Sequence, residues 1–195
     1  MTVLTFNPET HEYFWNGQPV PSVTHILQQV VDYSGIPADV LERKRRIGEA
    51  VHQAIALDLA HDLDEESVVD PWAPYFMAWH RFLIETGFEV FLFEHRVFHR
   101  KYGYAGTLDL WGRVNGQYVL IDIKTSSDIH PATALQTAAY AAALEDQEQL
   151  ETKARYALQL KPDGGYELHP HKGSSDFQVF LALLSVYNWR GRNGL

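Results

Sequence analysis

The sequence predicts an α/β fold in which helices flank a mixed, mostly antiparallel central sheet, with an N-terminal β-hairpin ahead of it. Residues 88–124 contain three consecutive runs with the two-residue period of strands, and helical patterns lie on both sides of them. Between two of these runs stands Asn115-Gly116, a strong hairpin signal because both residues tolerate the positive φ angles of a type I′ turn.

The N-terminal elements follow from turn and capping residues. Short apolar runs separated by Asn7-Pro8-Glu9 and Asn16-Gly17 predict the hairpin over residues 3–20. Ser22 is a suitable N-cap for a short helix over residues 22–31. Pro37 fits the first turn of a long helix that ends near residue 60.

The remaining elements alternate between the sequence pattern of helices and that of strands. The acid-rich stretch 58–70 reads as a solvated connector, and an aromatic-rich pattern ending at Gly87 predicts a helix with a glycine C-cap. The elements expected from there on are a strand meander at 88–100, 104–114 and 117–124, an alanine-rich helix at 131–145, strands at 154–160 and 166–169, and a last helix at 176–189.

Length and composition indicate one globular domain. The chain has 195 residues, 46% of them hydrophobic and 21% charged, which suits an ordinary soluble protein with a real core. We expect a single domain, with residues 1–35 as the hairpin and first helix and residues 36–195 as its core. No run approaches the length of a membrane helix, and Met1–Asn7 lacks the basic and apolar regions of a secretory signal, so a cytoplasmic protein without membrane partners is expected.

Charge and cysteine content narrow the function further. The absence of cysteine excludes disulfides, thiolate zinc sites, thiol catalysis and iron–sulfur clusters, which leaves His, Asp and Glu as metal ligands. A net charge of −9 has the wrong sign for wrapping nucleic acid by bulk charge. Any such binding must depend on local cations.

The Asn115-Gly116 turn also fixes a register. Val114 faces Gln117, and further along the same hairpin Asp109 faces Asp122, with Lys124 on their face. Directly opposed residues have β-carbons about 4.5–5.5 Å apart, where like charges are destabilising unless a cation compensates them. The other face, with Leu108, Leu110, Val114, Val119, Ile121 and Ile123, is apolar and should pack inward.

Two carboxylates beside a lysine suit metal-dependent phosphodiester hydrolysis. Mg²⁺ prefers hard oxygen ligands, and a bound metal lowers the pKa of its water while a lysine stabilises developing negative charge. The alternative interpretation is a surface salt-bridge cluster in which Lys124 balances two acids.

Several short motifs then resemble, in order, those of the PD-(D/E)XK nuclease superfamily, and most of all its RecB-like and phage-type exonuclease branch without an iron–sulfur cluster. The motifs lie between residues 48 and 160: Gly48-Glu49-Ala50-Val51-His52, Gly106-Thr107-Leu108-Asp109, Ile121-Asp122-Ile123-Lys124-Thr125, and Gln136 with Tyr140. The resemblance implies a restriction-endonuclease-like core.

The resemblance also implies roles for these residues. His52, Asp109 and Asp122 would be metal ligands, with the Ile123 carbonyl beside them. Lys124 would be the catalytic lysine, and Gln136 an orienting residue. The metal would be Mg²⁺ or Mn²⁺, since an imidazole ligand suits the latter. Glu94, on the strand before Asp109, is a candidate for a second metal site, although the turn at Tyr102-Gly103 does not fix its register.

Candidate DNA contacts are few. Arg43, Lys44, Arg45 and Arg46 form the only dense basic run, either as a phosphate clamp beside His52 or as a solvated helix face paired with Glu42 and Glu49. Tyr140 and Gln136 share a helix face, where they suit either the substrate or polar contacts with the sheet. Tyr102, Tyr104 and Trp111 are minor candidates for base stacking, and His95, His99, His169 and His171 are expected to be surface histidines rather than ligands.

The sequence therefore predicts a metal-dependent deoxyribonuclease, an exonuclease acting on DNA ends in recombination, repair or replication, in a bacterial or phage-infected cell. Its partners would be DNA and a single-strand-binding or recombination protein; the oligomeric state is left open. A non-catalytic nucleic-acid-binding or assembly protein with the same fold is one alternative. A metal enzyme with a closed small-molecule pocket is another.

Overall fold

The computed structural model describes residues 3–195 and holds two sheets. The hairpin expected over residues 3–20 gains a further strand, because the chain turns again at Asn16 and Gly17, whose φ angles are 51° and 79°. The resulting antiparallel sheet has the order β1 (Leu4–Asn7), β2 (Glu12–Trp15) and β3 (Gln18–Val20).

The first helices begin close to the predicted residues. Ser22 caps α1 (Val23–Leu27) by accepting a hydrogen bond from the His25 amide at 3.1 Å. This helix is shorter than expected, because the Gln29 side chain donates to the Ile26 carbonyl at its end. The other elements before the central sheet are α2 (Ala38–Leu59), which follows Pro37, a 3₁₀ turn (Glu65–Ser67) within the acidic connector, and α3 (Ala73–Thr86), which ends at Gly87 with φ 63°.

The central sheet has five strands in the order β4-β5-β6-β7-β8. The first three form the predicted antiparallel meander, with the predicted register from Val114↔Gln117 to Leu110↔Ile121. β7 is parallel to β6, so the helix between them is a crossover connection. The elements are β4 (Glu89–His99), β5 (Tyr104–Val114), β6 (Gln117–Lys124), α4 (Ala132–Glu148), β7 (Ala154–Leu160), β8 (Tyr166–Pro170) and α5 (Asp176–Asn193).

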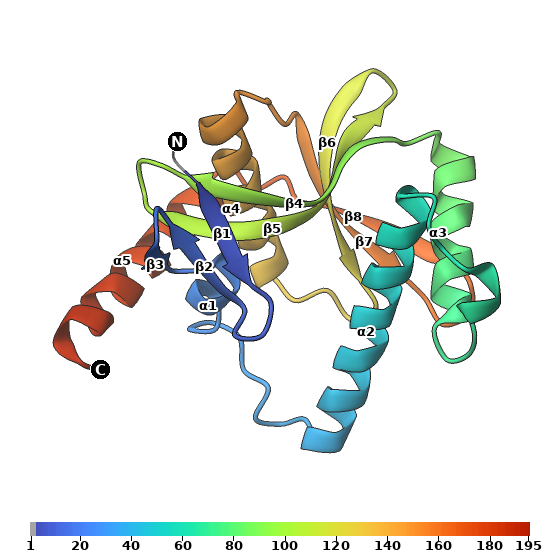
Figure 1. Cartoon of the computed structure of the whole chain (residues 1–195), viewed down its shortest axis with the longest axis horizontal. Coiled ribbons are helices and arrows are strands. Elements are labelled where there is room, and N and C mark those ends of the chain that lie inside the picture. The colour runs from blue at the N-terminus through green and yellow to red at the C-terminus, as the bar shows by residue number, and fades with distance from the viewer. Residues whose placement is uncertain (1–2) are drawn as a thin grey trace.

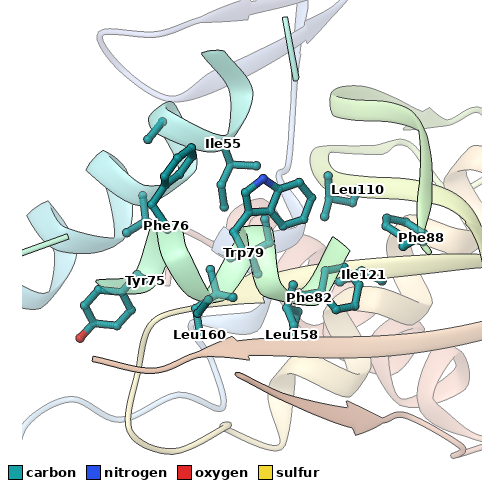
Figure 2. Close-up of a cluster of buried hydrophobic side chains, with 14 of the residues drawn as sticks. Ile55, Tyr75, Phe76, Trp79, Phe82, Phe88, Leu110, Ile121, Leu158 and Leu160 are labelled. Atoms are coloured by element: carbon teal, nitrogen blue, oxygen red, sulfur yellow. The ribbon is translucent and has the colours of Figure 1, made fainter. Parts of the chain in front are cut away.

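Helices cover both faces of this sheet (Figure 1). On one face, α2 and α3 pack around Trp79 and Phe82, which meet Leu110, Ile121 and Leu158 of the sheet (Figure 2). On the other face, α1, α4 and α5 enclose a second core. The mixed α/β class is therefore confirmed.

The alternation of side chains along β5 is interrupted at Asp109. Leu110 packs in the core beneath α2 and α3, whereas Leu108 packs in the core beneath α1, α4 and α5. In a regular strand, residues two apart share a face. The expectation that Leu108 and Leu110 share a face is therefore wrong, and the irregular residue between them is the aspartate.

The N-terminal sheet packs against one end of the central sheet (Figure 1). The Trp15 ring stacks on Phe98 of β4 with centroids 4.1 Å apart, and Ser22 forms an isolated bridge with Ala105 of β5. Within residues 3–195, none of the helices has both the length and the apolar character needed to cross a bilayer.

Candidate metal centre

Three side chains that could bind a metal meet where α2 crosses β4 and β5. His52, Glu94 and Asp109 each offer a ligand atom, and these atoms lie within 4.8 Å of one another. His52 Nδ1 is 3.4 Å from Glu94 Oε1 and 3.7 Å from Asp109 Oδ1. One imidazole and two carboxylates are a donor set that suits a divalent cation such as Mn²⁺ or Mg²⁺.

Glu94 reaches this cluster through two irregularities of β4. A bulge between Val90 and Leu92 shifts the register, so that Glu94 lies between the pairs Phe93↔Leu110 and His95↔Leu108 and faces Asp109. Its own φ is 44°, a left-handed conformation that is strained for a glutamate. Backbone strain of this kind is concentrated at functional sites, and here it accompanies a carboxylate aimed at His52.

His52 is held on α2 by close packing against the end of β6. Gly48, one turn earlier, lies against this segment, since a β-carbon there would meet Thr125 Oγ1 at 3.4 Å. His52 Nε2 is 3.3 Å from the Ile123 carbonyl oxygen. Thr125 and the Ile123 carbonyl are thus the parts of this segment that lie against α2 at Gly48 and His52.

Without a metal, the imidazole itself supplies positive charge to the cluster. Burial disfavours the charged ring, but the carboxylates of Asp109 and Glu94 outweigh it and raise the pKa of His52 to about 9. At neutral pH the ring is thus protonated, and a metal ligand would have to release that proton.

Asp122 belongs to a second group of side chains beside the first. Its carboxylate is 1% exposed, and Lys124 Nζ lies 2.6 Å from Oδ2. Lys124 also donates to Gln136 Oε1 at 3.2 Å, and Gln136 Nε2 donates to the Tyr140 hydroxyl at 3.3 Å. A polar chain thus runs from the strand to α4 and holds the ammonium in place.

The two aspartates are linked through the backbone. The Ile123 amide between Asp122 and Lys124 donates to Asp109 Oδ2 at 2.6 Å. Asp122 lies outside the three-residue cluster, because the break in β5 turns Asp109 toward α2 while Asp122 stays on the α4 side. Simple cross-strand pairing places the two aspartates near each other but does not give these separate orientations.

The electrostatics of both aspartates favour a cation. Burial raises the pKa of Asp109, against the opposing effect of His52 and Lys124. Burial likewise raises the pKa of Asp122 to about 6, although Lys124 opposes it. A divalent ion would stabilise the ionised carboxylates that burial disfavours, so the residues fit such a group.

These residues line an open cleft of about 820 Å³. The sequence did not predict that the N-terminal sheet lies here, but Phe6, His11 and Tyr13 line the cleft, and the Tyr13 hydroxyl lies 2.7 Å from Thr107 Oγ1. No local sequence signal connects that sheet with residues 94 positions further on. The contact depends on tertiary packing alone.

The basic run divides into two pairs. Arg45 bonds Glu42 and Glu49, and Arg46 bonds Glu42, so their charges are neutralised as in the solvated-face interpretation. The arginines in turn lower the pKa of Glu42 to about 2.

The other two basic residues, Arg43 and Lys44, line a second cleft of about 720 Å³. Thr125 lines both clefts, which therefore adjoin just after the end of β6.

Other candidates lie in structural positions. Tyr140 is 3% exposed, with its ring against Gly106 and its hydroxyl toward Gln136, so little of it reaches the cleft. Tyr104 and Trp111 are buried in the core beneath α4, away from the clefts. The four strand histidines have local partners instead of a shared metal: His95 meets Glu148, His99 lies near Asp146, His169 contacts Gln159, and His171 contacts Thr137.

Among known proteins, the chain is distantly similar to some solved structures. No family model matches the chain, and no curated protein matches it either. One solved structure that matches is an alkaline exonuclease (LHK-Exo) from Laribacter hongkongensis, with a TM-score of 0.42 and 15% sequence identity over 89% of this chain and 92% of that chain. Because a likeness at this level does not bear on activity, the chemistry depends on the side chains themselves.

Proposed function

We propose that this protein is a metal-dependent nuclease that hydrolyses phosphodiester bonds in DNA. The observation that supports this most is the convergence of His52, Glu94 and Asp109 in an open cleft that also contains Lys124. An open cleft suits a polymer, whereas a small-molecule enzyme would have an enclosed pocket.

His52, Glu94 and Asp109 would hold Mg²⁺ or Mn²⁺, with the Ile123 carbonyl and Asp122 beside them. When bound, the ion would supply a water of lowered pKa and neutralise phosphate charge. Glu94 thus belongs to this same cluster in the proposal, instead of completing a separate second site.

Lys124 acts as a fixed positive charge. Burial would lower its pKa, but Asp122 and Asp109 outweigh burial and raise it, so the side chain stays an ammonium at neutral pH. It is therefore suited to stabilise negative charge that develops on the phosphate, and unsuited to accept a proton. Asp122 and Gln136 orient it from two sides.

The DNA strand would run from the site cleft past Thr125 into the second cleft. Arg43 and Lys44 have no carboxylate partner among residues 3–195 and line that cleft, so they are the proposed phosphate contacts. Arg45 and Arg46 are already paired and would contribute less. We expect action at DNA ends, as an exonuclease does.

The test uses end-labelled linear DNA and closed circular DNA, single- and double-stranded, with an RNA oligomer alongside. Each is incubated with Mg²⁺, Mn²⁺ or EDTA. Loss of linear DNA that needs metal, spares circles and disappears in Lys124→Met supports an exonuclease. Lys101→Met is the matched control, because Lys101 lines neither cleft and stacks on Tyr102 at 5.1 Å.

Cleavage of circles would indicate an endonuclease. Metal-independent cleavage, or cleavage that persists in Lys124→Met, would contradict the proposed site. If the folded protein binds DNA but cuts none with any metal, the non-catalytic binding protein becomes the better interpretation.

A further inference from the structure

The lining of the site cleft includes a group of aromatic side chains from the N-terminal sheet. Phe6 of β1, His11 of the β1–β2 turn and Tyr13 of β2 line it together with the candidate metal ligands. The Phe6 ring centroid lies 4.8 Å from that of Tyr13 and 5.8 Å from that of His11, which meets it edge-on. Phe6 is only half-buried and His11 is exposed, so these rings are accessible from the cleft.

The side chain of Arg96 lies over the Phe6 ring. The Arg96 guanidinium lies 5.1 Å from the Phe6 centroid, and Arg96 follows Glu94 by two residues on β4. Among the Arg and Lys side chains lining this cleft, Arg45 pairs with glutamates and Lys124 with Asp122, whereas Arg96 has no carboxylate partner in the described part of the chain. The cleft thus offers one exposed, uncompensated guanidinium.

This combination matches the needs of an unpaired nucleotide. Aromatic rings stack on bases of any sequence, and arginine binds phosphate through paired N–H groups. In a protein of net charge −9, phosphate binding depends on such local cations. A base in a duplex is stacked between its neighbours and is not available to a protein ring, so aromatic lining residues select single-stranded nucleic acid.

We propose that the N-terminal sheet and Arg96 bind the nucleotide next to the bond that is cut, with its base against Phe6 and His11 and its phosphate on Arg96. The substrate is therefore single-stranded at that point: a single-stranded DNA end, or a duplex end that has opened. This inference rests on the proposed nuclease function for the meaning of the cut bond, but binding can be measured without any cleavage.

The first test measures binding in EDTA, with fluorescent single-stranded 12-mers and a blunt duplex of the same sequence. Arg96→Gln should weaken single-strand binding roughly tenfold and reduce the slope of log affinity against log salt by about 0.7. Phe6→Leu, which keeps an apolar side chain in the small core, should weaken it roughly 5- to 100-fold.

A matched control exists elsewhere in the chain. The Arg113 guanidinium lies 5.6 Å from the Phe91 centroid in a similar pair, outside the cleft. Arg113→Gln should bind like the wild type. Equal binding by Arg96→Gln and Arg113→Gln, or tighter binding of the duplex than of the single strand, would overturn the inference.

The second test locates the base by removing it. An abasic residue is moved along the first four nucleotides from each end of a single-stranded substrate, and kcat/KM is measured for the wild type and Phe6→Leu. At one position, loss of the base should lower kcat/KM of the wild type roughly tenfold and leave kcat/KM of the Phe6→Leu variant unchanged. A merely structural role for Phe6 predicts the same abasic penalty in both proteins, and that result would reject the stacking.

The two proposals fail in different ways. If no metal supports cleavage but Arg96→Gln still weakens single-strand binding, the nuclease function is wrong and the binding site stands. If DNA is cut while Arg96→Gln and Phe6→Leu bind and cut like the wild type, the nuclease stands and the binding site is wrong. Circular dichroism confirms folding of each variant, and Arg96→Gln keeps the test valid if Phe6→Leu unfolds, because Arg96 is exposed.

Discussion

Gly106→Ala provides a sharp test of how the polar chain is supported. Gly106 on β5 faces the Tyr140 ring on α4, and a β-carbon at this position would lie 2.5 Å from Tyr140 Cε1 and 3.3 Å from Cδ1. Ordinary carbon contacts are about 3.5–4.0 Å, so the ring or the strand must move by about 1 Å. Tyr140 is 3% exposed, which leaves the ring little room to yield.

The cost should appear in both stability and activity. Overpacking of this kind destabilises by about 1–3 kcal/mol. The Tyr140 hydroxyl accepts a hydrogen bond from Gln136, and Gln136 accepts one from Lys124. A displaced Tyr140 ring therefore moves Gln136 and, through it, the Lys124 ammonium. A misplacement of about 1 Å near reacting groups can lower the rate by up to about 100-fold.

Urea unfolding and DNA cleavage are measured for Gly106→Ala, Tyr140→Leu and the double variant. If the clash is the cause, the smaller side chain at position 140 makes room for the methyl group, and the double variant is more stable than additivity predicts by about 1 kcal/mol or more. Gly191→Ala is the control, because nothing lies within 4 Å of its β-carbon position in α5. Its free energy of unfolding should rise by up to about 1 kcal/mol. Additive effects at positions 106 and 140 would refute the reasoning.

Three further predictions concern the site. Lys124→Met should abolish cleavage and lower the free energy of unfolding by about 3–5 kcal/mol, because it leaves the buried Asp122 carboxylate unpaired. Urea unfolding should show that adding Asp122→Asn restores most of this loss. A Lys124→Met variant as stable as the wild type would contradict the buried pair. Because the carboxylates around His52 outweigh its burial and raise its pKa to about 9, protons compete with Mn²⁺ for the ring. The affinity for Mn²⁺ should therefore rise from pH 6 to pH 8 by up to about tenfold per pH unit. Calorimetry should show a weaker pH dependence of Mn²⁺ affinity in His52→Gln, and a wild-type affinity that does not change with pH would exclude His52 as a ligand. Arg43→Gln should weaken DNA binding and lower the slope of log affinity against log salt by about 1, whereas Arg45→Gln should change this slope less, because Arg45 is ion-paired. Fluorescence anisotropy at several salt concentrations measures the slopes. Equal slopes for the two variants would contradict the proposed phosphate contact at Arg43.

The sequence predicted features that depend on local chemistry. Asn115-Gly116 has a backbone preference strong enough to fix a register, and Leu110↔Ile121 lies where that register places it. Gly87 ends α3 in the predicted left-handed conformation for the same kind of reason.

The sequence did not predict features that depend on departures from regular geometry. Period-two alternation cannot show that β5 is irregular at Asp109, or that a bulge and a left-handed φ turn Glu94 toward α2. Sequence spacing alone does not predict whether Arg45 binds a neighbouring glutamate or a phosphate. The position of Phe6 depends on how two sheets pack, for which the chain has no local signal.

The irregularities of β4 also affect how the protein behaves in crowded solution. β4 is an edge strand of the central sheet, and Phe91 and Phe93 are exposed on it, 47% and 37%. A long, regular, apolar edge strand is a template for pairing with another chain and so for aggregation. The bulge beside Phe91 and the left-handed Glu94 interrupt that template in the middle of the strand. The same two departures that orient a carboxylate for chemistry therefore also protect the fold from self-association through this edge.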